Sequence, residues 1–384
     1  MSWKETCAVK ERMRFIVAYE ENERDFSEIC RVFGISRKTG YKWIKRFDEE
    51  GVSGLEDRSR APHEPSNKMC ESLSSMILMT KCDNMNWGPR KIIVWLSQEY
   101  PDIKWPAASS AGELLKRNGL VKPRKKRRRF TPYTQPFADC SGPNDTWSID
   151  YKGQYRLQNG KYCYPLTLTD NFSRYLLACD AHDRISGLQA KQVMEQVFKE
   201  HGLPAVIRSD NGPPFAGRGL GALSSLSVWW QKLGITHERI RPGHPEENGR
   251  HERMHRTLKE KIIESPCEDL LRQRVEFKAF LHSYNYERPH EGIGNQRPGW
   301  VYEESHRLYP CYLEEIEYGR EYETRRIRTN GTMKWNGSEI YISEPLIGEQ
   351  IGLLQTSDQE WLIYFSSLKL GIFNEATMKV RPIV

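Results

Sequence analysis

The sequence has little that would place the protein in a membrane or outside the cell. No apolar run approaches the ~18 residues that a membrane-spanning helix needs, and the first residues form no apolar signal segment. The nine cysteines are odd in number and form no CxxC pair, which argues against a disulfide scaffold and against a zinc ribbon. We therefore expect a cytoplasmic protein, and its 384 residues are enough for roughly two to four domains.

Positive charge is concentrated in the first third of the chain. Residues 1–137 hold 27 of the 58 basic and 18 of the 51 acidic residues, so the remainder, with 31 and 33, is close to neutral. The excess peaks in residues 122–129, where seven of eight positions are basic. Such a run repels itself, so either it is a solvated linker or it binds a polyanion such as nucleic acid. The residues predicted to grip phosphates are Lys122, Arg124, Lys125, Lys126, Arg127, Arg128 and Arg129.

The N-terminal residues 1–60 predict a helix-turn-helix. Apolar residues recur at helical spacing over 26–33, Gly34 breaks the pattern, and Ser36 is a typical N-cap for a second helix. The apolar stripe expected on that helix is Tyr41, Ile44 and Phe47. Basic residues off the stripe would face DNA, and they are Arg37, Lys38, Lys42, Lys45 and Arg46. The alternative is a helical hairpin with a basic outer face.

The rest of the chain divides into four further segments that differ in composition and in hydrophobic pattern. Residues 61–121 predict a second helical DNA-binding module of winged-helix or helix-turn-helix type, and residues 122–137 a basic linker. In 138–300, apolar runs typical of strands alternate with helical patterns in the order βββαβαβαα, which predicts a mixed α/β sheet with flanking helices. Residues 301–384 contain short strands separated by turns, which predict a small β barrel.

Three acids stand where strands end or a helix begins: Asp150, Asp210 and Glu252. Sites in open α/β sheets lie beyond the carboxyl ends of the strands, and three carboxylates gathered there need a cation. Oxygen ligands suit Mg²⁺ or Mn²⁺, and two such ions about 4 Å apart would suit phosphodiester chemistry. Four further acids compete for these positions: Asp145, Asp170, Glu246 and Glu247.

The sequence around the acids resembles a known family. The segments are Trp147-x-x-Asp150-Tyr, Ser209-Asp-Asn-Gly-Pro-Pro-Phe215, Pro245-x-x-Asn-Gly-x-x-Glu-Arg-x-His255 and Asn285-Tyr-x-Arg-Pro-His290. In this order they resemble the DDE transposases of bacterial insertion sequences, which share the catalytic core of retroviral integrases. The resemblance covers residues 138–300 strongly and the other segments loosely.

That resemblance implies a ribonuclease-H-like core with Asp150, Asp210 and Glu252 as the metal-binding triad. It also implies nicking at element ends and attack of the freed 3′-hydroxyl on target DNA, without a covalent protein–DNA intermediate. One departure is the 41 residues between Asp210 and Glu252, more than in the best-known integrases. The glycine- and serine-rich stretch 217–225 is expected to hold the extra length.

Three residues follow Glu252 on its helical face, namely His255, Arg256 and Lys259. The resemblance implies that they hold the DNA end, and the alternative is a solvated basic face. No Cys/His spacing supports zinc.

The combined prediction is a homo-oligomeric transposase that binds double-stranded DNA, both element terminal repeats and target, and is nucleoid-associated when bound. Two alternatives stay open: an inactive, captured transposase that regulates by binding DNA, and a metal-dependent nuclease without strand transfer.

Overall fold

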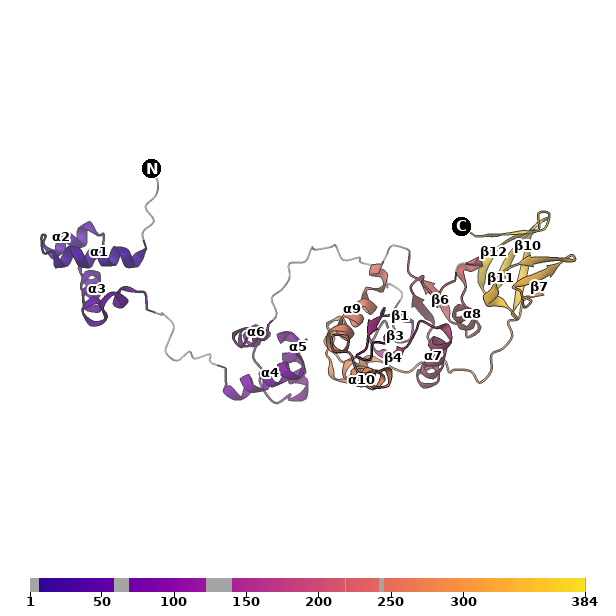
Figure 1. Ribbon diagram of the computed structural model, residues 1–384, viewed down its shortest axis with the longest axis horizontal. Helices are drawn as coiled ribbons and strands as arrows, with labels where there is room; N and C mark the ends of the chain where they lie inside the picture. The colour runs from indigo at the N-terminus through magenta and orange to yellow at the C-terminus, as the bar shows by residue number, and fades with distance from the viewer. Residues whose placement is uncertain (1–6, 59–68, 122–139, 218, 242–244, 384) are drawn as a thin grey trace. The chain divides into compact units, whose positions relative to one another are not determined.

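The computed structural model describes residues 7–58, 69–121, 140–217, 219–241 and 245–383 (Figure 1). The chain forms two compact units, residues 1–70 and 71–384. Within the described residues, no helix has both the length and the apolar character to cross a membrane.

The first unit is a three-helix module built from α1 (Ala8–Glu20), α2 (Phe26–Val32) and α3 (Arg37–Glu50). The turn between α2 and α3 follows the predicted pattern, because Gly34 adopts a φ of +67° and the Ser36 side chain accepts a hydrogen bond from the Thr39 amide. Gly40 lets the two helices approach closely, since a Cβ there would lie 2.8 Å from Phe26 Cζ. This arrangement agrees with the predicted helix-turn-helix.

The buried face of α3 differs from the predicted stripe. Trp43 is buried, and its ring lies 3.9 Å from the Arg12 guanidinium, whereas Tyr41 is 60% exposed. The prediction was wrong for Tyr41 because that side chain lies against the Phe26 ring, with centroids 4.3 Å apart, at the edge of the module. Ile44 and Phe47 are half-buried against the core, as expected.

The second unit begins with three more helices, α4 (Glu71–Asp83), α5 (Pro89–Glu99) and α6 (Ala108–Arg117). Their facing sides bury Ile77, Ile92, Leu96 and Leu115. Gly119 follows α6 with a φ of +69°, as a helix C-terminus requires. Three helices thus occupy the range in which the sequence predicts a second helical module.

A mixed sheet forms the centre of this unit. Its strands are β1 (Thr146–Tyr151), β2 (Tyr155–Arg156), β3 (Tyr162–Asp170), β4 (Leu176–His182), β5 (Val206–Ser209) and β6 (Thr236–Arg239). The main order is β4-β3-β1-β5-β6, and the two-residue β2 adds to β3. The β1–β5 and β5–β6 pairs are parallel and the others antiparallel, so the sheet is mixed as predicted, while β2 gives it six strands rather than the predicted five.

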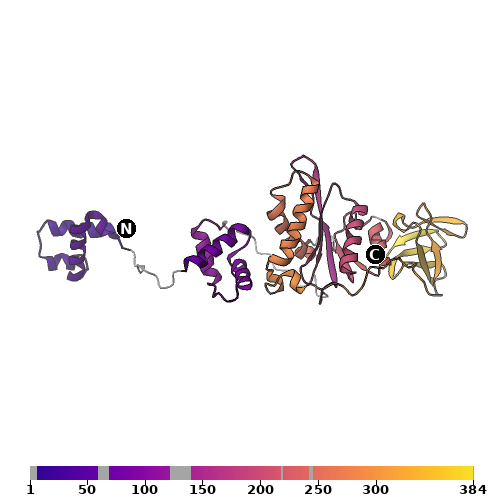
Figure 2. The same ribbon diagram turned by 90° about the horizontal axis from the view of Figure 1, so that it is seen from below.

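Helices cover both faces of the sheet (Figure 2). One face packs against α7 (Gly187–His201) and α8 (Ser225–Lys232), and the other against α9 (Gly249–Leu258) and α10 (Leu270–His282). Trp147, Phe198 and Trp230 are fully buried on the first side. On the second side Met254, Leu258 and Phe277 pack against β3 and β4. Helical turns extend α9 to Ile263 and α10 to Glu287.

The C-terminal residues form an open antiparallel sheet. Its order is β13 (Lys379–Pro382), β12 (Leu368–Asn374), β11 (Glu360–Phe365), β10 (Gln350–Ser357) and β7 (Glu323–Arg326). A separate hairpin joins β8 (Thr332–Trp335) and β9 (Ser338–Tyr341). A closed barrel, as predicted, would require β7 to pair with β13. In the described residues these two strands are the edges of an open sheet.

The C-terminal sheet shares a hydrophobic cluster with the mixed-sheet core. Leu223 and Val228, from the segment around α8, are buried among residues such as Leu346 and Leu370. Beside them Lys232 Nζ lies 2.9 and 3.0 Å from the two carboxylate oxygens of Glu349. The stretch predicted to hold the extra length before Glu252 therefore packs against the C-terminal sheet.

Candidate active site at the ends of two parallel strands

The parallel pairing of β1 and β5 places two of the predicted acids on neighbouring strands. Ser148 lies opposite Arg208 in the register, so Asp150 and Asp210 each follow two residues later, at the carboxyl ends of adjacent strands. This edge is where ligand sites form in open α/β sheets.

A tight turn fixes the position of Asp210. The Gly212 amide donates to Asp210 Oδ1 at 3.1 Å, and a Cβ on Gly212 would lie 3.1 Å from Asp210 Oδ2. Asn211 Nδ2 donates to the Ile240 carbonyl at 2.6 Å, which ties this turn to the residue after β6. The Asp-Asn-Gly sequence thus holds the carboxylate at the end of β5.

The third acid, Glu252, has an exposed side chain in the first turn of α9. Burial, the charge of Asp210 and, as a smaller cause, the charge of Glu252 together raise the pKa of Asp150 to about 7, against the lowering effects of Lys152 and of the Tyr151 backbone hydrogen bond. The other two predicted acids therefore both act electrostatically on Asp150. Their mutual repulsion favours either a proton on Asp150 or a bound cation.

A network of buried hydrogen bonds connects Asp150 to α9. Thr167 faces Asp150 across the β1–β3 pair, and its hydroxyl lies 3.1 Å from the Asp150 carbonyl, 2.8 Å from His251 Nε2 and 2.7 Å from His255 Nε2. Thr169 Oγ1 lies 2.7 Å from His251 Nδ1. A hydroxyl has one proton, so at least one imidazole must donate to Thr167. The network holds the helix of Glu252 against the strands of Asp150.

Both histidines of this network are neutral. Burial lowers the pKa of His251 to about 3, and burial together with the neighbouring His251 lowers the pKa of His255 far below its usual range. The 3.7 Å contact between His255 Nδ1 and Asp150 Oδ2 is thus no ion pair. Sequence reasoning missed Thr167 and the structural role of His251; threonine at alternate positions of β3 was the available signal.

The donor set at this edge fits a hard cation. Asp150, His251 and His255 each offer an atom within 4.8 Å of the others, but both nitrogens of His251 already take part in hydrogen bonds. The carboxylates of Asp150, Asp210 and Glu252 would offer oxygen ligands instead, and Mg²⁺ and Mn²⁺ prefer such ligands.

The competing acids have structural partners. Asp145 Oδ2 accepts three hydrogen bonds from Ser141 and Gly142, each at 2.8 Å; burial opposes its ionisation, but these bonds outweigh it and lower its pKa. Asp170 accepts from Ser173 and from the Asn144 amide. Glu247 accepts from the Arg241 amide at 2.8 Å. The side chain of Glu246 lies outside the described residues.

The residues predicted to contact DNA along α9 fall into two groups. Arg256 and Lys259 are exposed, whereas His255 is only 3% exposed. The expectation that His255 faces DNA therefore disagrees with the structure, because its ring is enclosed by Thr167 and His251.

In the N-terminal module, Arg37, Lys38, Lys42 and Lys45 are exposed. Arg46 is half-buried, and its guanidinium lies 5.1 Å from the Trp43 ring, so part of its role is structural. The basic run from Lys122 to Arg129 lies outside the described residues.

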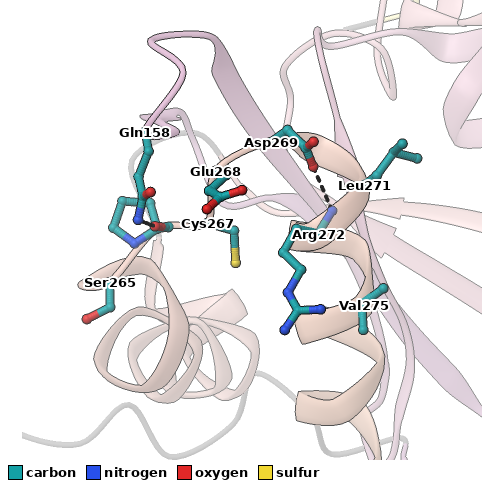
Figure 3. Close-up of a pocket in the computed structure, with 9 residues that line it drawn as sticks. Gln158, Ser265, Cys267, Glu268, Asp269, Leu271, Arg272 and Val275 are labelled. Carbon is teal, nitrogen blue, oxygen red and sulfur yellow. Dashed lines mark hydrogen bonds between the residues drawn. The ribbon is translucent and has the colours of Figure 1, made fainter.

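A hollow elsewhere on the core contains none of the three acids. Figure 3 shows its residues around the loop before α10, where Asp269 caps the helix by accepting from the Arg272 amide at 2.8 Å. Gln158 Nε2 donates to the Pro266 carbonyl at 2.9 Å, which ties the β2–β3 hairpin to that loop. These hydrogen bonds cap a helix and join two loops, and they indicate no ligand.

Comparison with known families agrees with this architecture. Residues 141–245 and 233–298 match integrase core domains, residues 11–63 match a helix-turn-helix domain, and residues 39–115 match a homeodomain-like domain. The chain thus carries an integrase core domain preceded by helix-turn-helix sequence, which confirms the resemblance that the motifs indicated.

Related proteins include two from bacterial insertion elements. The chain is 28% identical over 229 residues to an uncharacterized 39.2 kDa protein of insertion element IS476 from Xanthomonas euvesicatoria, a match covering 59% of this chain and 64% of the relative. It is 28% identical over 187 residues to a 31.7 kDa protein of insertion element IS407 from Burkholderia multivorans, covering 48% and 65%. The matches thus span just under two thirds of these relatives.

A viral relative and a solved structure are also similar. The Pol polyprotein of feline endogenous virus ECE1 is 32% identical over 146 residues, which is 37% of this chain and 13% of that protein. The HTLV-2 integrase catalytic core domain in complex with magnesium aligns with a TM-score of 0.33 and 16% identity, over 42% of this chain and 99% of that one.

Proposed function

We propose that this protein is a DDE transposase of an insertion sequence, which nicks element ends and transfers the freed strand into target DNA. The observation that carries the proposal is the electrostatic grouping of Asp150, Asp210 and Glu252 at one edge of an integrase core domain. The helix-turn-helix matches and the insertion-element relatives support DNA ends as the substrate.

In this proposal Asp150, Asp210 and Glu252 hold Mg²⁺, or Mn²⁺, as two ions. When bound, such ions supply Lewis acidity for activating an oxygen nucleophile and for stabilising the leaving oxygen of a phosphodiester. The chain's own contribution is rigidity: the Gly212 amide orients Asp210, and Thr167 with the two histidines fixes Glu252's helix. Arg256 and Lys259 are exposed on the same helix and hold the DNA end.

The remaining parts of the proposal concern DNA binding and assembly. The module 1–60 reads element ends through Arg37, Lys38 and Lys42, the module 61–121 adds contacts, and the linker 122–137 grips phosphates without sequence preference. The core 138–300 acts in a homo-oligomer, because two ends are joined to one target. The C-terminal residues 301–384 contact DNA or a neighbouring subunit.

The test uses the DNA that flanks the gene as the source of element ends. Labelled end DNA, supercoiled plasmid and Mg²⁺ are mixed with the wild type, with Asp210→Asn and with Glu252→Gln. Glu264→Gln is the matched control, because Glu264 is an exposed acid further along the same helical segment. We expect joined end–plasmid products from the wild type and the control, and none from the two site variants.

Other outcomes favour the alternatives. Cutting without joining would indicate a metal-dependent nuclease. Specific end binding without cutting or joining, in Mg²⁺ and in Mn²⁺, would contradict the enzyme proposal and favour a DNA-binding regulator.

A further inference from the structure

A strongly positive cavity lies beside α9, and none of the three acids lines it. It has a volume of about 370 Å³, and four arginines and a lysine line it together with one acid, Glu291. We call it the arginine pocket, and its cations are Lys91, Arg174, Arg250, Arg253 and Arg288. They come from α5, the β3–β4 turn, α9 and the segment after α10.

The backbone is shaped to bring Arg174 into this cavity. Arg174 has a φ of +67°, in the left-handed region that residues with a side chain rarely adopt. Its guanidinium donates to the Asn171 carbonyl. Gly292 stands next to it, and a Cβ on that residue would lie 3.4 Å from Arg174 Nε. The unusual backbone conformation of Arg174 therefore accompanies a guanidinium that lines the cavity.

The cations in the arginine pocket repel one another. Burial lowers the pKa of Arg174 to about 10, with Arg250 as the next cause. Burial also lowers the pKa of Lys91 to about 8, with Arg288 next and Glu291 opposing. Among the described residues, no carboxylate forms an ion pair with Arg174, Arg253 or Arg288. Concentrated, partly desolvated positive charge of this kind is stabilised by an anion.

The geometry points to a backbone phosphate of DNA as that anion: we propose that the arginine pocket binds one phosphodiester group of the DNA on which the core acts. The inference rests on the proposed function for its ligand. Guanidinium groups bind phosphate oxygens in pairs, and several converge on this single cavity.

The position of the pocket on α9 favours bound DNA over free phosphate. Arg250, Arg253 and Thr257 line the pocket at helical spacing, while Glu252 lies on another side of the same helix. The two sides are separated by about 10–12 Å, the diameter of a helix. Duplex DNA covers that distance in roughly three base steps of ~3.4 Å. A duplex with its reacting group at the acids would therefore extend a phosphate to the arginine pocket.

The experiment measures how DNA affinity depends on salt. The full chain is titrated with a labelled random-sequence duplex at several salt concentrations in EDTA, so that no reaction occurs. The variants are Arg253→Gln and Arg253→Gln/Arg288→Gln, with Arg253→Lys as the charge-retaining form. Arg272→Gln is the matched control, since Arg272 is exposed on α10 outside the pocket.

For one bound phosphate, the double variant is expected to reduce the slope of log K against log salt by about 0.9, with affinity falling roughly ten-fold. Arg253→Lys and Arg272→Gln should keep the wild-type slope. Because Arg253 is exposed, Arg253→Gln alone tests the inference if the double variant does not fold. An unchanged slope in Arg253→Gln and in a folded double variant would overturn it.

Two further arms separate the sources of failure. Thermal stabilisation of the wild type by inorganic phosphate, combined with an unchanged DNA slope, would assign the pocket to free phosphate and overturn the inference. Asp210→Asn should bind DNA like the wild type. If the wild type joins no DNA but the pocket variants still lower the slope, the proposed function fails and the pocket assignment stands.

Discussion

Replacing Asp150 with asparagine should make the metal-free core more stable above neutral pH. Asp150 is 22% exposed, and burial with two neighbouring carboxylates raises its pKa to about 7 from an unperturbed 3.8. The ionised carboxylate is thus poorly accommodated in the folded protein. Asparagine has nearly the same shape and no charge, so it removes this penalty.

The magnitude follows from the two pKa values. Below pH 3.8 the group is protonated in the folded and unfolded chain alike, so it carries no penalty. As pH rises towards 7, the unfolded chain releases the proton first, and stability is lost. At ~1.4 kcal/mol per pH unit, the penalty is less than about 2 kcal/mol at pH 5 and at most about 4 kcal/mol at pH 8. The gain from Asp150→Asn should therefore increase between these two pH values.

The assay is thermal melting of the wild type and Asp150→Asn in EDTA at pH 5 and pH 8. For a unit of this size, each kcal/mol corresponds to ~2–4 °C, so the difference at pH 8 should reach several degrees. Added Mg²⁺ should then raise the melting temperature of the wild type and have little effect on the variant. A variant that is less stable at pH 8, or a difference independent of pH, would refute this reasoning.

Three further changes test other parts of the structure. Thr167→Val removes three hydrogen bonds and leaves buried imidazole nitrogens without partners, so core melting should show a loss of roughly 2–4 kcal/mol, and Thr167→Ser should lose much less. Gly54→Ala would place a Cβ 2.2 Å from the Arg46 carbonyl oxygen; circular dichroism should show unfolding of the first unit and an unchanged transition of the second. Lys232→Met leaves Glu349 partly buried without its ion pair, and hydrogen exchange should show faster opening of the C-terminal sheet by roughly ten-fold.

Sequence patterns predicted most of the fold because the elements carry strong local signals. Gly34 and Ser36 marked the helix-turn-helix, and the apolar run before Asp210 marked a buried strand. The face of α3 was harder to predict. Trp43 is buried in a hydrophobic cluster that includes residues of α1, and Arg12 of the same helix lies over its ring from 31 positions away. The short strand β2 was also missed, since two residues carry no periodicity.

At the candidate site, the sequence singled out three acids as candidates but did not predict the residues that surround them. The motifs singled out Asp150, Asp210 and Glu252, and the structure relates them electrostatically. His255 follows Glu252 at helical spacing, so the sequence favoured a shared exposed face. The packing of α9 on β3 turned that ring toward Thr167 instead. The arginine pocket combines residues that lie far apart in the sequence, so no local sequence pattern could predict it.

The shared cluster at Leu223 and Val228 has a practical consequence for dissecting the protein. These two residues are 3% and 4% exposed because the C-terminal sheet covers them. A fragment ending near residue 300 would leave them facing water, and such patches promote aggregation. Poor solubility of that fragment would then result from the loss of the C-terminal sheet that covers α8, and not from misfolding of the mixed-sheet core. A chimera that takes its C-terminal sheet from a relative would also expose or mispack this cluster, unless residues 217–232 are exchanged together with the sheet.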